Sequence, residues 1–116
     1  MSILQKLSPV NIDSKGVFKY ILIKASDGAT ERFLVRGYGR CKFHADILEE
    51  VQASEGEKAI EFSCVGGGRV KHEPEAKRIF VYGYSQGFGR ADHAKSVEIL
   101  RERYPNYAIE WSNEGY

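Results

Sequence analysis

The sequence has few of the features that hold small secreted domains together or anchor a chain in a membrane. Its 116 residues include two cysteines, Cys41 and Cys64, and no C-x-x-C pair. This cysteine usage is typical of a reducing compartment and disfavours both a disulfide framework and a structural zinc site. A run of about 18 apolar residues, the length that crosses a bilayer, occurs nowhere, and residues 1–10 lack the apolar run of a signal peptide. We therefore expect a cytoplasmic protein that does not enter a membrane.

An excess of charge of one sign is also missing. Lys and Arg together number 17 and Asp and Glu 16, which gives a net charge of +1. Such a chain has no long-range field that attracts nucleic acid or anionic lipid, so we expect neither as a partner. With 42% hydrophobic residues the chain can build one core, and no linker, repeat or low-complexity tract divides it. We expect residues 1–116 to fold as one domain and to act as a monomer.

The spacing of apolar residues predicts a mixture of strands and helices. The expected strands are residues 17–23, 31–36, 59–65, 70–72, 78–84 and 107–111, and the expected helices run from about 44 to 54 and between 89 and 105. Residues 1–12 are interpreted as either a loose arm or a short first strand. The order ββαβββαβ predicts an α/β (α+β) fold, with a single mixed β-sheet of about six strands flanked by two helices.

Each predicted helix has an apolar stripe that would face the sheet. The stripes are Phe43, Ile47 and Val51 in the first helix and Ala94, Val97, Leu100 and Tyr104 in the second. In the first strand, Phe18, Tyr20 and Leu22 are expected on one face. Lys19 would then share the other face with apolar residues, either at the mouth of a cleft or extended toward solvent.

Residues that could carry chemistry gather where strands lead into helices. His44 is expected in the first helical turn, where the positive end of the helix lowers the affinity of an imidazole for its proton. Three glycines at 66–68, followed by Arg69, are typical of a sharp turn or a close approach to a ligand. Residues 85–87, Ser-Gln-Gly, are typical of a loop whose N–H groups bind an anion. The alternatives are a surface histidine without a task and two ordinary turns.

Taken together, these residues describe a site for a single phosphoryl group. His44 would be the base, Lys19 and Arg69 would supply positive charge, and the 85–87 loop would supply hydrogen-bond donors. Neither glycine loop matches a nucleotide-binding fingerprint, and nothing in the sequence would hold a nucleoside. No Asp or Cys lies at ligand spacing from His72 or His93, so we interpret both as surface or structural residues. We expect neither a metal nor another cofactor.

Six blocks of residues follow one another in a fixed order along the chain. They are Gly-Val-Phe-Lys-Tyr at 16–20, Val-Arg-Gly-Tyr at 35–38, His-Ala-Asp-Ile at 44–47, Gly-Gly-Gly-Arg at 66–69, Val-Tyr-Gly-Tyr-Ser at 81–85 and Trp-Ser-Asn-Glu-Gly-Tyr at 111–116. In this order they resemble the small phosphohistidine phosphatases of the janus family. The likeness runs from about residue 13 to residue 116, and six ordered blocks are far more specific than one short motif.

The resemblance implies a metal-independent protein phosphatase that removes phosphate from phosphohistidine in proteins, with phospholysine as a further substrate of some members. It places the catalytic histidine on His44, the substrate-binding lysine on Lys19, the loop arginine on Arg69 and the phosphate-binding loop on Ser85, Gln86 and Gly87. Arg36 and Ala45 are expected to support this site. Two departures bear on substrate preference: the N-terminal arm and the 24–31 loop are shorter than in vertebrate members, and residues 86–87 replace a more apolar pair.

Several interpretations stay open at this point. His44 would act on an in-line water as a general base, or attack phosphorus itself and become transiently phosphorylated. A binding module would use the same pocket to recognise phosphorylated partners without turnover, although phosphate capture alone needs no base. A purely structural domain would leave the two glycine loops without a purpose. Cys41 lies close to His44 in sequence, and we expect it to have no role.

Overall fold

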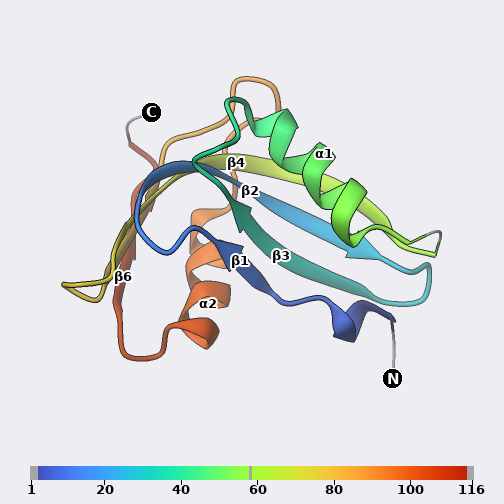
Figure 1. The fold of residues 1–116 in the computed structure, drawn as a ribbon, viewed down its shortest axis with the longest axis horizontal. Coiled ribbons are helices and arrows are strands. Elements are labelled where there is room, and N and C mark those ends of the chain that lie inside the picture. Colours follow the sequence, from blue (N-terminus) through green and yellow to red (C-terminus); the bar gives the residue numbers. More distant parts are fainter. Residues whose placement is uncertain (1–2, 58, 115–116) are drawn as a thin grey trace.

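The computed structural model describes residues 3–57 and 59–114, which form a six-stranded mixed sheet with two helices (Figure 1). The strands are β1 (Val10–Ile12), β2 (Gly16–Ser26), β3 (Glu31–Gly37), β4 (Glu61–Glu73), β5 (Arg78–Tyr82) and β6 (Ala108–Trp111). They lie in the order β1-β3-β2-β4-β5-β6. The β1–β3 and β5–β6 pairs are parallel, whereas the three inner pairs are antiparallel. The predicted fold class is confirmed.

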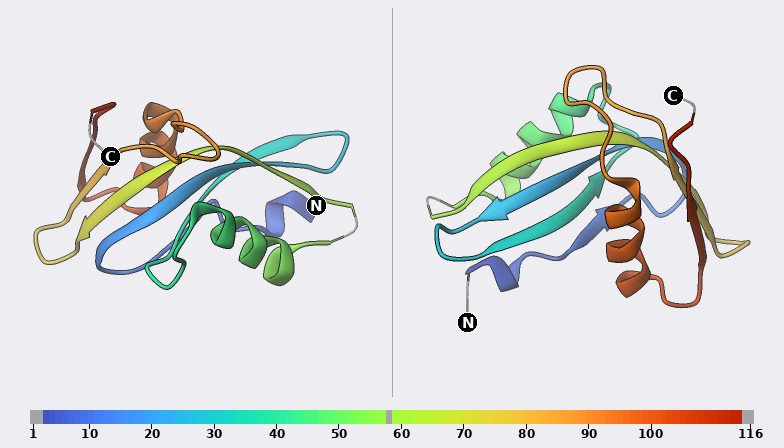
Figure 2. Two further views of the ribbon diagram at one scale, coloured as in Figure 1. Left: turned by 90° about the horizontal axis from the view of Figure 1, so that it is seen from above. Right: turned by 180° about the vertical axis from the view of Figure 1, so that it is seen from behind.

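The two helices lie on opposite faces of the sheet (Figure 2). α1 (His44–Glu55) packs on β2, β3 and β4, and α2 (His93–Arg103) packs on the other face, against β1, β3, β5 and β6. The middle of β2, residues 20–23, is therefore buried on both sides. Its Phe18, Tyr20 and Leu22 join the core beneath α2, which confirms their predicted common face, and Ile21 and Ile23 join the core beneath α1. No helix in the described ranges is long and apolar enough to cross a membrane.

The glycines at 66–68 correct one part of the predicted strand pattern. They do not interrupt the sheet, because β4 runs through them as one strand, and the separate strand expected at 70–72 is its continuation. The pairing of β4 with β2 shifts register between Ile21 and Ile23, and Gly66 at this point has a φ of +138°. Glycine adopts such a positive φ without steric cost, which suits it to this β-bulge.

The N-terminal residues supply the remaining strand. From the sequence, residues 1–12 were interpreted as either a loose arm or a short first strand. The structure has a short 3₁₀ helix, η1 (Ile3–Lys6), followed by the strand β1. Residues 1–2 lie outside the described part. β1 pairs in parallel with β3, with Val10 opposite Val35. A three-residue edge strand is too short for alternation to reveal it. The expected number of strands was therefore right, although one expected strand was merged and another was added.

Each helix begins with a buried histidine that the predicted stripes omitted. The buried residues are His44, Ile47 and Val51 in α1, and His93, Ser96, Val97, Ile99 and Leu100 in α2. Phe43 is instead 60% exposed, and Ala94 is exposed as well, so both assignments to the inner stripes were wrong. Phe43 precedes α1 with extended backbone angles of −125° and 155°, so helical periodicity does not extend to it. Tyr104 packs against the core, as predicted.

Candidate active site

A hollow of about 630 Å³ opens where three segments far apart in the sequence meet. Its lining consists of Lys19 from β2, Lys42, Phe43, His44 and Ala45 at the start of α1, and Ser85, Gln86, Gly87 and Phe88 after β5. The fold thus brings Lys19, His44, Ala45 and the predicted 85–87 loop to one place. Sequence reasoning missed Lys42, Phe43 and Phe88 as lining residues, although each adjoins a predicted residue in the chain, which was the available signal.

The start of α1 places His44 at this hollow. The helix begins at His44 because Phe43 before it is extended, with its backbone N–H donating to the Asp46 carboxylate at 2.9 Å. Asp46 lies in the first turn, where a carboxylate also interacts favourably with the positive end of the helix. The sequence His-Ala-Asp therefore fixes both the first residue of the helix and the position of the imidazole.

The hydrogen bond of His44 decides which ring nitrogen is available. Nε2 lies 2.9 Å from the carbonyl oxygen of Gly68, which accepts hydrogen bonds and cannot donate them. Nε2 of the neutral ring therefore carries the proton, and Nδ1 keeps its lone pair. Within residues 3–57 and 59–114, no group makes a hydrogen bond to Nδ1. The open nitrogen of His44 is thus the one that could take a proton from a substrate or a water molecule.

The surroundings of His44 keep its ring neutral. Burial makes the largest contribution and lowers the pKa of His44 below its usual 6.5, since the side chain is only 7% exposed. The hydrogen bond to Gly68 opposes this effect, whereas the nearby positive charges of Lys19 and Arg69 lower the pKa further. A neutral imidazole at pH 7 was expected from the helix position, and in the structure burial is its main cause.

The glycines of β4 allow the His44 ring to lie against the strand. A Cβ atom on Gly67 would be 2.7 Å from His44 Cδ2, a distance that real Cβ atoms essentially never show, and 3.1 Å from Ser85 Cβ, which is also tight. A Cβ atom on Gly68 would be 2.7 Å from Cε1 of His93, on the opposite face of the sheet. The expected close approach at the glycine run is therefore made by two histidine rings of the protein itself.

The loop after β5 is fixed to β4 by its backbone. The N–H of Gly67 donates to the Gly89 carbonyl and the N–H of Ala91 donates to the Gly67 carbonyl, both at 3.0 Å. The N–H of Ser85 also donates to the Gly89 carbonyl, at 3.0 Å, so this expected donor for an anion is already engaged. Within the described residues, the N–H groups of Gln86 and Gly87 make no hydrogen bond. They are the donors that the loop offers to the hollow.

Arg69 and Arg36 have different relations to the site. Arg69 is in β4 rather than in a loop, directly opposite Lys19 of β2. Its positive charge lowers the pKa of His44. Arg36 is fully buried, and its guanidinium binds the Glu55 carboxylate at 2.7 and 2.9 Å. Glu55 is the last of the 12 residues of α1, which places it about 16 Å along the helix from His44. Arg36 thus braces the far end of α1 and does not join the hollow.

The other two histidines are structural. His93 Nε2 lies 2.8 Å from the Gly83 carbonyl, and His93 Nδ1 lies 2.6 Å from the Tyr20 hydroxyl. His72 Nδ1 lies 2.9 Å from the Asp13 carbonyl. Both side chains are buried, so the structural interpretation holds and the surface alternative does not. No group of three His, Cys, Asp or Glu side chains in the described ranges is arranged to hold a metal ion.

Comparison with known proteins identifies the family. Residues 4–108 match the model of the Janus/Ocnus family. The chain belongs to the Janus/Ocnus family.

The 14 kDa phosphohistidine phosphatase of Sus scrofa is 42% identical over 120 residues, covering 97% of this chain and 95% of that protein. The sex-regulated protein janus-A of Drosophila pseudoobscura pseudoobscura is 45% identical over 119 residues, covering 97% of this chain and 80% of that protein. The janus-A protein of Drosophila melanogaster is 46% identical over 108 residues, which cover 92% of this chain and 80% of that protein. Janus/Ocnus relatives thus include a phosphatase by name.

Proposed function

We propose that this Janus/Ocnus protein is a phosphohistidine phosphatase in which His44 is the general base. The observation that carries the proposal is the state of this ring: buried, neutral, fixed through Nε2 to Gly68 and open at Nδ1, beside a hollow that Lys19 also lines. The name of the porcine relative supports the same substrate class. We further propose that the protein acts as a cytoplasmic monomer on phosphohistidine-containing proteins, with phospholysine as an alternative substrate.

Hydrolysis of phosphohistidine requires the protein to position the reacting groups and to neutralise the charge of the phosphoryl oxygens. Phosphohistidine hydrolysis breaks a P–N bond and forms a P–O bond, as water attacks phosphorus in line with the leaving imidazole. His44 Nδ1 takes the proton that the water loses, and the leaving nitrogen gains a proton from solvent. His44 then releases its proton to solvent, and the products are histidine and inorganic phosphate. Because the transition state of phosphoryl transfer is loose, most of the acceleration comes from holding the oxygens and the water in place.

The remaining residues have roles that follow from their chemistry. The cations of Lys19 and Arg69 would neutralise the phosphoryl oxygens, while the N–H groups of Gln86 and Gly87 donate to them. The Ser85 oxygen accepts from the N–H of Phe88 at 3.1 Å, so its hydroxyl proton can also donate to the phosphoryl group. Ala45 lines the hollow next to His44. We expect this set to act without a metal ion.

The test is phosphate release from a phosphohistidine peptide in excess EDTA, with wild type and His44→Ala measured together. We expect release by wild type and a loss of about 10²–10⁴-fold in the variant, with peptide affinity retained. Circular dichroism and urea unfolding of the variant separate loss of the base from loss of the fold. No release by wild type, with the peptide still bound, would instead identify a non-catalytic binding module.

A second experiment separates the two routes open to Nδ1. A general base leaves no covalent trace, whereas a nucleophile would carry the phosphoryl group on His44 between two steps. Rapid quenching at alkaline pH, which preserves phosphohistidine, followed by mass spectrometry of the peptide containing His44, reports the difference. We expect no phosphorylated His44 during turnover, and a stoichiometric amount would contradict the general-base mechanism.

A further inference from the structure

Beside the hollow, one face of the sheet carries an ordered array of outward side chains. The pairing of β2, β4, β5 and β6 arranges them in three rows: Lys19, Arg69 and Tyr82; then Val17, Lys71, Phe80 and Glu110; then Glu73, Arg78 and Ala108. Lys19 belongs both to the first row and to the lining of the hollow. The array, which we call the open face, therefore begins at the proposed phosphate site and leads away from it.

The burial pattern shows that solvent reaches the open face. In β5 the side chains of Ile79 and Val81 are buried beneath α2, whereas Phe80 between them is 38% exposed. Val17 on β2 is 54% exposed. The rings of Phe80 and Tyr82 stack at 5.3 Å between centroids with an angle of 20°, forming a flat apolar platform. Aromatic groups held in this way are typical anchors of protein recognition.

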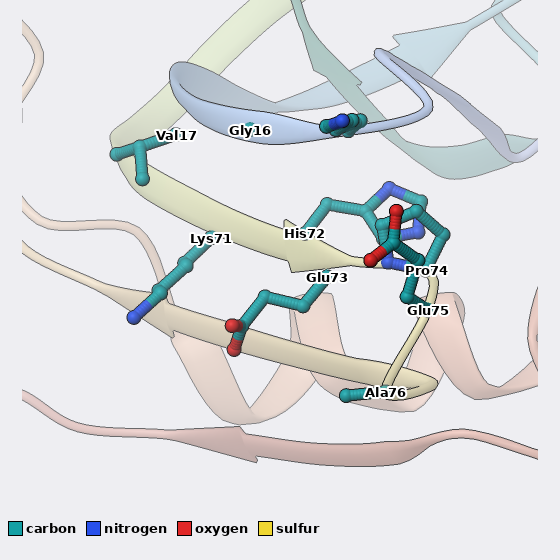
Figure 3. A pocket seen from close by; sticks show the side chains of 9 residues that line it. Gly16, Val17, Lys71, His72, Glu73, Pro74, Glu75 and Ala76 are labelled. Carbon is teal, nitrogen blue, oxygen red and sulfur yellow. The ribbon is translucent and has the colours of Figure 1, made fainter.

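Two hollows adjoin the open face. One, of about 310 Å³, has Val17, Lys71 and Glu73 along one side and His72, Pro74 and Glu75 along the other (Figure 3). The second, of about 220 Å³, is lined by residues that include Lys71, Phe80 and Glu110. They share Lys71 and Glu73, so both hollows adjoin the same two side chains of the open face.

Charge along the array changes with distance from His44. The first row carries the cations of Lys19 and Arg69 and no acid, whereas the second and third rows each carry one cation and one acid. The part nearest the hollow thus suits the dianionic phosphoryl group, and the part farther away suits a neutral or mixed segment with an apolar side chain. This graded charge matches a polypeptide with one phosphorylated residue better than a uniformly anionic partner.

We propose that the open face binds the polypeptide segment that carries the phosphorylated residue, with an apolar side chain of that segment seated on Phe80 and Tyr82. The proposal rests on the phosphatase function and names what its substrate must contain. Two strand spacings of about 4.8 Å and one row of about 7 Å separate Phe80 from Lys19, which gives about 12 Å. An extended chain covers this distance in three or four residues. The apolar residue is therefore expected three or four positions from the phosphorylated one.

The test compares two substrates that differ only in what they offer to the open face. Phosphoimidazole fills only the proposed phosphate site, whereas a phosphohistidine peptide with leucine three and four positions away on both sides also reaches Phe80. We expect Phe80→Ala to lower kcat/KM for the peptide about tenfold and to leave kcat/KM for phosphoimidazole unchanged. Trp111→Ala is the matched control, because Trp111 is an aromatic of similar exposure, 43%, on the neighbouring strand. Its partner Val81 is buried, so Trp111 belongs to the opposite face.

The outcomes keep the two proposals apart. A wild type that hydrolyses neither substrate overturns the phosphatase proposal, and this inference with it, before any variant is considered. A wild type active on both, with equal peptide kcat/KM in Phe80→Ala, overturns the inference alone. The inference is also overturned if Trp111→Ala loses as much peptide activity as Phe80→Ala. A change of sedimentation coefficient in Phe80→Ala would show that the platform pairs with a second copy of the chain instead.

Discussion

His44 and His93 are built into the fold in the same way. Each is the first residue of a helix, and each has Nε2 hydrogen-bonded to a backbone carbonyl, that of Gly68 at 2.9 Å and that of Gly83 at 2.8 Å. Each ring lies against a glycine of β4, Gly67 for His44 and Gly68 for His93, from opposite faces of the sheet. Burial is the main cause that lowers the pKa of both.

The second ring nitrogen separates the two histidines. Nδ1 of His93 accepts from the Tyr20 hydroxyl at 2.6 Å, and this hydroxyl also lies 3.0 Å from the Ser96 Oγ. Nδ1 of His44 has no such partner in the described parts of the chain, and its ring lines the hollow. A buried histidine at a helix start is thus a structural brace when both nitrogens are engaged, and a candidate base when one is left open.

The largest effect is expected where both histidines depend on one glycine. A Cβ atom on Gly68 would overlap the carbonyl oxygen of Tyr82 and crowd His93, and neither neighbour can move freely. We expect Gly68→Ala to lower the free energy of unfolding by more than about 3 kcal/mol, measured by urea denaturation. Gly87→Ala is the control for stability, because nothing lies within 4 Å of the added atom. A Gly68→Ala protein as stable as wild type would contradict the close packing described.

The next prediction contrasts the closed histidine with the open one. His93→Ala removes a buried ring and leaves the Gly83 carbonyl and the Tyr20 hydroxyl each without one partner, so we expect a loss of about 2–3 kcal/mol in unfolding free energy. His44→Ala leaves only the Gly68 carbonyl unpaired, next to a hollow that water can enter, and about 1 kcal/mol is expected. Urea midpoints of both variants report the difference. Equal losses of unfolding free energy would contradict the distinction between a structural His93 and an open His44.

A smaller effect is expected on the protonation of His44. Lys19 lowers the pKa of His44, so Lys19→Gln should raise it toward the usual 6.5, while the pKa of His93, whose charged neighbours are Arg90 and Asp92, stays where it is. NMR titration of the ring protons measures both values in one sample. In the proposed mechanism the neutral ring is the base, so turnover should fall as the pH falls through the pKa of His44, and the fall should begin at higher pH in the variant. An unmoved His44 pKa would show that Lys19 is electrostatically remote.

The smallest effect is expected at Cys41. Its thiol is three residues before His44, and burial raises its pKa, so little thiolate forms at pH 7. Cys41→Ser should change kcat/KM by less than about twofold, because a protonated thiol offers neither a nucleophile nor a base. Phosphate release by the variant measures this. A large loss of activity would give the cysteine a role that its surroundings do not indicate.

Some features of the molecule could be predicted because their sequence signals are local. Alternation marked β2 and β3, and helical spacing marked Ile47, Val51, Val97 and Leu100 as inner residues. The predicted stripes contained only apolar residues, so they omitted the buried His44 and His93. They included the exposed Phe43 and Ala94 instead. The role of Arg36 was missed because its partner Glu55 is 19 positions away, and no periodic pattern connects the two.

Other features depend on tertiary structure. The glycine run predicted a sharp turn or a close approach to a ligand, and its sequence does not say that the approaching groups are the rings of His44 and His93. The hydrogen bond from the Ser85 N–H to Gly89 likewise follows from how the loop closes. Which nitrogen of His44 stays open depends on Gly68, which is 24 positions away. The sequence therefore named most of the residues that line the hollow, whereas the ring nitrogen of His44 that stays open depends on the fold.

The most direct test of His44 as the open histidine is a nitrogen NMR measurement of both rings at pH 7, before and after addition of inorganic phosphate. We predict that His44 is neutral, with its proton on Nε2 and a bare Nδ1, and that phosphate shifts the Nδ1 signal of His44 but not that of His93. A proton on Nδ1 of free His44 would contradict this assignment. So would a phosphate response at His93 with none at His44.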